Sequence, residues 1–321
     1  MNEENINKVC VLIEKFFQDR EMQGYSPETI FHERQRIEYF LEFLKARDEE
    51  NLGEITLETL NKFQMHIYKN PGKSGKPLAL AVQGLILIVV RSFFRWLVRN
   101  NHILADPASG LELPRIKQKF PKGIMTKKEI EKVLAAPDVD TTRGLRDRAI
   151  MEVLYSTGMR NKELRELKVY DVNLPEGQIH IRQGKGGKDR IVPMGEIAAK
   201  YVELYLHESR QKILNSQGRN AHINEDPGYL FLSTNKTQLV GLSLRQIIKQ
   251  YALKVGLKNV ITPHSFRHTC ATHLLKGHAN IRHIQILLGH RSLVSTQVYT
   301  HLEIGDLKKE LKRCHPRERA C

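Results

Sequence analysis

The sequence is poor in cysteine and in long apolar segments, and each shortage excludes a class of protein. Its 321 residues include four cysteines and no CxxC pair, too few to staple a chain of this length with disulfides. The longest apolar run, Leu78 to Val90, is interrupted by Gln83. It is too short to span a bilayer and predicts a buried helix. The polar start MNEENINK does not resemble a secretory signal. We therefore expect a cytoplasmic protein.

Motifs for nucleotides and metals are also missing. There is no GxxxxGKS/T loop and no GxGxxG after a strand, so nothing indicates ATP or a dinucleotide. Among the 14 histidines, His264 and His268 lie four residues apart, as metal ligands can. However, HSFRH lacks the glutamate of HExxH, and Arg267 on the same helical face would repel a cation. The sequence predicts an activity that needs no cofactor and no metal.

What the chain has in excess is positive charge. Lys plus Arg is 51 and Asp plus Glu is 36, a net formal charge of +15. Residues 1–110 hold 14 basic and 15 acidic residues, whereas residues 111–321 hold 37 basic and 21 acidic ones. A surplus of this size favours a polyanionic partner, nucleic acid first and an anionic membrane surface second. The length and the uneven charge together predict two domains.

The first domain is predicted to be helical. Apolar residues recur at helical spacing over 6–23, Ser26-Pro27 is a helix start, and further helices follow Thr56 and run over 78–100. On the last of these, Arg91, Arg95 and Arg99 recur every four residues and share one face. Few acids lie nearby in the sequence, so this face is either a DNA contact or an ordinary solvated surface.

A basic, proline-rich linker over 106–125 separates the domains. Its lysines, Lys117, Lys119 and Lys122, have a spacing that suits a strap along a phosphate backbone. The second domain opens at Thr126 with a capping box and is predicted to be helical with a small β-hairpin, over 178–182 and 190–193. The predicted fold class is mainly α with a small β-sheet: a helical domain over 1–105 and an α+β domain over 126–321.

Several groups suited to holding phosphate lie near turns of this second domain. Thr262-Pro263 predicts a helix N-terminus, an anion site by its free N–H groups, with His264 and Arg267 in its first turns. Each single residue has an ordinary structural explanation, such as an arginine that pairs with a nearby acid. The set also includes Arg160 with Glu163 one turn later, Lys185 at a glycine-rich hairpin tip, His290 at a helix end, and Tyr299.

In this order, the residues resemble the tyrosine recombinase, or phage integrase, family, and its Xer-like members most. The matching stretches are YSTGMRNKELREL (155–167), GKGGKDRIVPMG (184–195), TPHSFRHTCATHLL (262–275) and LLGHRSLVSTQVYTHL (287–302). They span the catalytic domain in order. The helical first domain and the linker resemble the family's core-binding, SAM-like domain, which with the catalytic domain would grip opposite sides of duplex DNA.

The resemblance implies a role for each residue. Tyr299 would attack the scissile phosphate and form a 3′-phosphotyrosyl link. Arg160 and Arg267 would hold the non-bridging oxygens, His264 and His290 would hydrogen-bond the phosphate, and Lys185 would protonate the leaving 5′ oxygen, with Lys188 in reserve. Glu163 would support Arg160. The expected activity is site-specific recombination of double-stranded DNA, without metal or ATP, by a tetramer that could include a paralogous recombinase.

Three features leave alternatives open. The same chemistry serves strand-relaxing topoisomerases and hairpin-forming resolvases, and the scaffold without activity would be a DNA-binding regulator. A predicted tail helix over 304–312 would dock on a neighbouring protomer, by resemblance, or would pack on its own domain. Residues 212–228 look longer than in compact Xer-like members, which leaves room for the recombinase of a mobile element.

Overall fold

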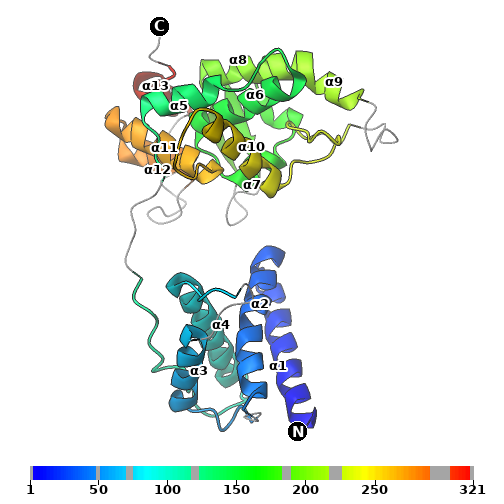
Figure 1. The fold of residues 1–321 in the computed structure, drawn as a ribbon, viewed down its shortest axis with the longest axis vertical. Helices are drawn as coiled ribbons and strands as arrows, with labels where there is room; N and C mark the ends of the chain where they lie inside the picture. Colours follow the sequence, from blue (N-terminus) through cyan, green and yellow to red (C-terminus); the bar gives the residue numbers. More distant parts are fainter. Residues whose placement is uncertain are drawn as a thin grey trace. The chain divides into compact units, whose positions relative to one another are not determined.

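The chain folds into two compact units, Met1–Gln118 and Lys119–Cys321 (Figure 1). The computed structural model describes residues 3–47, 51–69, 75–116, 123–182, 189–216, 226–289 and 304–318. Within these ranges helices predominate and the named strands form one three-stranded sheet. The predicted fold class, mainly α with a small sheet, is confirmed.

In its described residues, the first unit has four helices, α1 (Glu3–Met22), α2 (Pro27–Lys45), α3 (Leu57–Lys69) and α4 (Leu80–Arg99). The sequence starts α2 as predicted, because the Ser26 side chain accepts the N–H of Thr29 and Pro27 fills the first turn. Aromatic rings fill the space between the helices, with Phe40 edge-on to Phe63 at 5.1 Å between ring centroids.

Helix α4 is the core helix of this unit. It is long and apolar enough to cross a membrane, but more than half of its apolar segment is buried inside the unit. Leu87, Val90 and Phe94 are fully buried there. The predicted burial of the 78–90 segment is confirmed for one face, which includes Leu87 and Val90, and is wrong for the other, where Leu80, Val82, Leu85 and Ile88 are exposed. The buried face packs against α1, α2 and α3.

The second unit surrounds helix α6 (Thr142–Thr157), which is buried on every side over residues 144–157. The other helices are α5 (Lys127–Ala135), α7 (Asn161–Glu166), the 3-10 helix η1 (Val169–Asp171), α8 (Glu196–Leu204), the π-helix η2 (Tyr205–Arg210), α9 (Gln211–Leu214), α10 (Gly241–Lys254), α11 (Pro263–Lys276), α12 (Ile281–Leu288) and α13 (Ile304–Cys314). Helices α8 and α11 pack directly on α6. The predicted capping box at Thr126 and Glu129 is present and starts α5.

The sheet is antiparallel in the order β1 (Val172–Asn173), β2 (Gln178–Ile181) and β3 (Arg190–Pro193). The predicted hairpin of β2 and β3 is confirmed, whereas β1, only two residues long, has no periodicity that the sequence could reveal. Ile179 pairs with Val192, and both are buried. Ile181 pairs with Arg190, so Arg190 lies on the same, inner face as these apolar residues.

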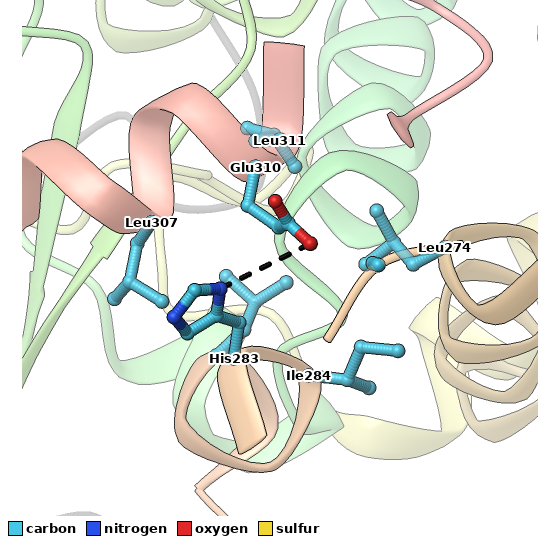
Figure 2. A pocket seen from close by; sticks show the side chains of 8 residues that line it. Leu274, His283, Ile284, Leu307, Glu310 and Leu311 are labelled. Carbon is cyan, nitrogen blue, oxygen red and sulfur yellow. Dashed lines mark ion pairs between the residues drawn. The ribbon is translucent and has the colours of Figure 1, made fainter. Parts of the chain in front are cut away.

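The tail helix α13 packs on its own unit, which is the second of the two predicted possibilities. Figure 2 shows Leu307 and Leu311 of α13 facing Leu274 of α11 and Ile284 of α12 across a small apolar pocket. Beyond α13, buried His315 makes a hydrogen bond to the carbonyl oxygen of Tyr155 on α6, 3.1 Å away. The tail is thus part of the unit's core.

A π-helix, η2, interrupts the long helix that runs into residues 212–228. From Ser216 onward this stretch is polar and turn-rich, which predicts a loop. Arg210, at the end of η2, is almost fully buried and forks onto the carboxylate of Asp226 with both N–O distances at 2.7 Å. It also donates to the carbonyl oxygen of Tyr229. The two ends of the loop are therefore fixed to the unit, while residues 217–225 lie outside the described residues.

Candidate active site

The site begins where α6 ends. Gly158 closes α6 in the left-handed conformation, at φ 60°, and a Cβ there would lie 2.5 Å from the side chain of Leu288. Only glycine fits this turn. The chain then reverses through Met159, and Arg160 stands immediately before α7 with its side chain partly exposed. The predicted turn therefore places Arg160 beside the end of α12.

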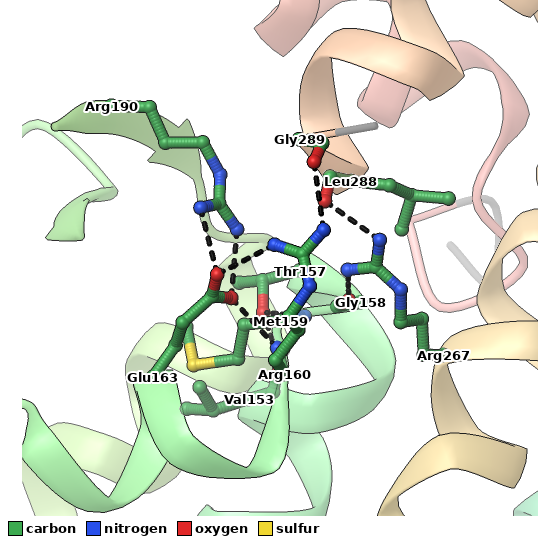
Figure 3. A network of polar contacts seen from close by, with 10 residues as sticks. All are labelled: Val153, Thr157, Gly158, Met159, Arg160, Glu163, Arg190, Arg267, Leu288 and Gly289. Carbon is green, nitrogen blue, oxygen red and sulfur yellow. Dashed lines mark hydrogen bonds and ion pairs between the residues drawn. The ribbon is translucent and has the colours of Figure 1, made fainter. Parts of the chain in front are cut away.

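Arg160 is held at three points (Figure 3). Its backbone N–H donates to Oε2 of Glu163 at 2.7 Å, and its Nη1 donates to Oε1 of the same carboxylate at 2.8 Å. Its Nη2 donates to the carbonyl oxygen of Gly289 at 2.7 Å. The predicted support of Arg160 by Glu163 is present as a contact. The guanidinium keeps further N–H groups, since it has five donors in all.

Arg267 lies in the second turn of α11 and is buried, with 5% of its surface exposed. Its Nη1 donates to the carbonyl oxygen of Gly158 at 2.8 Å, and its Nη2 donates to that of Leu288 at 2.7 Å. Burial, followed by the positive charge of Arg160, lowers the pKa of Arg267 to about 10, so it stays charged at neutral pH. Among the described residues Arg267 forms no ion pair with an acid, so the alternative in which it pairs with one does not hold there.

The acceptors of both arginines are mainly backbone carbonyls at helix ends. Gly158 caps α6, and Leu288 and Gly289 close α12. Such carbonyls have no partner within their helix and carry the negative end of its dipole. They can orient a guanidinium without neutralising its charge. The arrangement therefore leaves a concentrated positive site, which suits a phosphate.

Glu163 is the one carboxylate in this network, and a second arginine shares it. Arg190 of β3 forks onto Glu163 with N–O distances of 2.9 and 2.8 Å. Burial alone would raise the pKa of the Glu163 carboxyl, but the hydrogen bonds and charge of Arg190, together with those of Arg160, lower it to about 2. Glu163 is thus ionised throughout the neutral range.

His264 lies at the start of α11, where the predicted N-cap is confirmed because Thr262 accepts the N–H of Ser265. Its ring meets that of His268 edge-on, 4.3 Å between centroids. Burial, then the charges of Arg267 and Arg160, lower the pKa of His264. At neutral pH the ring is therefore largely neutral and able to accept a proton. Phe266, Cys270 and Leu274 anchor the helix in the core as predicted.

Other predicted site residues lie outside the described residues: Lys185, Lys188, His290, Tyr299, Lys117, Lys119 and Lys122. Their roles stay predictions. In the sequence, His290 directly follows Gly289, and residues 183–188 connect β2 to β3, which carries Arg190.

The arginines of α4 belong to the first unit. Arg95 and Arg99 are exposed and Arg91 is half-buried. The premise that acids are scarce around this face is wrong for Arg99, because its Nη2 donates to Asp19 of α1 at 2.7 Å. Asp19 is 80 positions away in the sequence, which is why local counting missed it. Among the described residues, Arg91 and Arg95 have no ion pair.

Arg190 is the site residue that motif reasoning missed. A usable signal was present, because alternation along Arg190-Ile191-Val192 places the arginine on the same face as Val192. The structure confirms the alternation, with Ile191 exposed and Val192 buried. An arginine at an inward position of a strand needs a partner, and Glu163 is that partner.

Comparison with known proteins agrees with this geometry. Residues 124–304 match the model of the phage integrase family. Tyrosine recombinase XerC 2 of Ralstonia nicotianae is 34% identical over 304 residues, which cover 95% of this chain and 85% of that protein. Tyrosine recombinase XerD of Listeria monocytogenes is 36% identical over 296 residues, 92% of this chain and 95% of that protein.

Solved structures show the same fold. The XerH site-specific recombinase bound to difH substrate aligns with a TM-score of 0.63 at 23% identity, over 92% of this chain and 82% of that one. A lambda integrase dimer bound to a COC' core site aligns with a TM-score of 0.63 at 20% identity, over 88% and 94%.

The family match and these relatives define a class, the enzymes that break and rejoin DNA strands. The chain belongs to the phage integrase family and is a site-specific tyrosine recombinase, similar to the Xer recombinases. The predicted resemblance and the predicted activity are confirmed. Topoisomerase-like, resolvase-like and inactive alternatives are not favoured by these relatives.

Proposed function

We propose that this chain cuts duplex DNA by attack of the Tyr299 hydroxyl on a phosphodiester. Arg160 and Arg267 hold the non-bridging oxygens, His264 and His290 hydrogen-bond the phosphate, and Lys185 protonates the departing 5′ oxygen. The observation that carries the proposal is that Arg160 and Arg267 both donate to helix-end carbonyl oxygens, and that the one carboxylate on Arg160, Glu163, is also bound by Arg190. This arrangement keeps fixed positive charge where the phosphoryl oxygens gather negative charge.

The nucleophile needs activation, because free tyrosine has a pKa of about 10. The positive field of the two arginines favours the phenolate, and a neutral His264 accepts the proton. The P–O bond to the 5′ oxygen breaks as the bond to tyrosine forms. A 5′-hydroxyl from a second strand then reverses the step. The ester bond energy is kept in the protein link, so the mechanism requires neither ATP nor a metal.

We further propose that both units contact the same DNA. The predicted first domain, over 1–105, presents Arg91, Arg95 and Arg99 to phosphates, and the predicted linker over 106–125 adds Lys117, Lys119 and Lys122. Recombination requires two duplexes, and a lambda integrase tetramer has been solved on a Holliday junction. We expect four copies of this chain, or two with a paralogous recombinase, on paired sites in the cytoplasm.

The test is covalent trapping of DNA in cells. The chain and its Tyr299→Phe variant are expressed, denatured without reversal of the link, captured and analysed for attached DNA. Tyr170→Phe is the matched control, because Tyr170 is an exposed tyrosine of the same unit that contacts Arg182 only through its ring.

We expect adducts at one DNA motif with the unchanged chain and with Tyr170→Phe, and none with Tyr299→Phe. The purified protein should then cut the recovered site in EDTA without ATP. Adducts that persist in Tyr299→Phe, or a strict need for Mg²⁺, would contradict the proposed mechanism. A plasmid with two recovered sites should give deletion or inversion; relaxation alone would indicate a topoisomerase.

A further inference from the structure

Arg190 connects the two sides of the site. It comes from β3, its side chain is 16% exposed, and both its terminal nitrogens donate to the two oxygens of Glu163. Its Nε is buried and has no acceptor among the described residues. Figure 3 shows Glu163 between the guanidiniums of Arg190 and Arg160.

The second contact of Arg190 is with Gly289. This glycine has φ 63°, and a Cβ added to it would lie 3.0 Å from Cζ of Arg190. The guanidinium therefore packs against the very residue whose carbonyl oxygen accepts from Arg160. Arg190 thus touches both groups that fix Arg160, the carboxylate on one side and the closing residue of α12 on the other.

The charges of the network favour a role beyond packing. If Glu163 paired with Arg160 alone, the pair would be neutral, and Arg160 would attract a phosphate weakly. With Arg190 on the same carboxylate, the three groups together carry one net positive charge. Buried charges interact strongly because water does not screen them well, so this difference bears directly on the neighbouring phosphate position.

We propose that Arg190 is a positioning residue of the recombination reaction. It orients Arg160 through Glu163 and Gly289, and it balances the carboxylate so that the charge of Arg160 remains available to the scissile phosphate. This inference rests on the proposed function, since it assigns Arg190 to the phosphate site described there. Arg190 itself need not touch DNA.

The test measures single-turnover cleavage by Arg190→Met and Arg190→Lys on a nicked duplex of the sequence recovered by trapping. We expect Arg190→Met to lower the cleavage rate about 100-fold, as misplaced catalytic groups do, with the affinity for DNA changed by less than about twofold. Arg190→Lys keeps the charge but not the fork, so it should recover part of the rate.

Arg182→Met is the matched control. Arg182 follows β2 on the same sheet and makes its own arginine–carboxylate pair, with Asp171 at 2.6 Å, outside the site. Its loss should leave the cleavage rate nearly unchanged. Thermal unfolding of all three variants verifies that they fold, and if Arg190→Met does not, the partial loss expected for Arg190→Lys carries the test.

The pH profile separates positioning from mere stability. Without Arg190, burial of Glu163 is less well offset, so its pKa rises and protonation sets in at higher pH. The acid limb of the cleavage rate should therefore move to higher pH in Arg190→Met and not in Arg182→Met.

Two outcomes would overturn the inference alone: normal cleavage by Arg190→Met, or a loss of rate with an unshifted pH profile. No adduct with the unchanged chain would overturn the proposed function, and the inference with it.

Discussion

The arginines of α4 and the arginines of the second unit are held in opposite ways. Arg95 and Arg99 extend from the surface of the first unit, and Arg99 pairs with Asp19, which is half-buried. Arg267 is buried and donates to two backbone carbonyls. The first kind can adapt to a DNA backbone but is screened by salt. The second kind is fixed before DNA arrives.

This difference implies separate roles for the two groups of arginines, in the chemical step and in DNA binding. Fixed, buried cations stabilise charge at one point and govern the chemical step, because they need no rearrangement when the reaction occurs. Exposed cations contribute to association, largely independently of sequence. A variant of a fixed, buried arginine should change the rate of cleavage, and a variant of an exposed arginine should change affinity and its salt dependence.

The largest effect is expected at Arg267. Arg267→Lys keeps a positive charge but cannot reach the carbonyl oxygens of Gly158 and Leu288 together. Single-turnover cleavage should fall about 10³-fold, while the affinity for DNA changes much less. A comparable loss in affinity would mean that Arg267 acts mainly in binding. The assignment of buried arginines to the chemical step would then be wrong.

A smaller effect, on the free energy of unfolding, is expected when a buried ion pair and an exposed ion pair are broken in turn. Arg317, after the tail helix, donates to Glu152, a carboxylate that is 1% exposed and also accepts from Arg148. Arg317→Met should lower the free energy of unfolding by about 2 kcal/mol, because a buried charge loses a partner. Arg99→Met, which breaks an exposed pair, should cost less than about 0.5 kcal/mol.

Urea unfolding, followed by a signal from each unit, measures the change in the free energy of unfolding for both variants. Equal costs for Arg317→Met and Arg99→Met would show that burial does not distinguish these two pairs. The same result would weaken the structural role assigned to the tail, because Glu152 lies on the central helix α6.

The smallest effect is expected on DNA binding by the first unit. Arg95→Met should weaken binding several-fold at low salt and make the log–log slope against salt less steep by about 0.9, one phosphate contact. Arg99→Met should change the slope less, because its pairing with Asp19 competes with DNA. Binding titrations at four salt concentrations test this, and identical slopes for both variants and the unchanged chain would remove α4 from the DNA interface.

The helices and the family were predictable because their causes are local. Ser26-Pro27 and Thr126-x-x-Glu129 start helices through contacts within one turn, and both were confirmed. The burial of Arg267 was not predictable. Its acceptors, Gly158 and Leu288, lie 109 and 21 positions away and are backbone atoms, which leave no trace in residue type.

The same reason explains the other differences. The pairing of Arg99 with Asp19 spans 80 positions, and the packing of α13 on α11 and α12 depends on tertiary contacts. Motifs identified Arg160, Glu163, His264 and Arg267 as one set, and the structure brings these four into one network of contacts and charges. The motifs gave Arg190 no role, and its part in the site emerged only from its hydrogen bonds to Glu163 of α7.

Arg160 and Arg267 donate to backbone carbonyl oxygens, and this determines which positions of the site a saturation mutagenesis screen would find sensitive. The oxygen atoms of Gly158, Leu288 and Gly289 exist whatever side chain the residue carries, so Leu288 should accept many apolar replacements with activity intact. The two glycines should tolerate few replacements, since both have positive φ and a Cβ would crowd Leu288 at Gly158 and Arg190 at Gly289. In such a screen the carbonyl acceptors of the phosphate site would therefore be visible only through two glycines that resist substitution. No polar side chain at these positions would indicate their role.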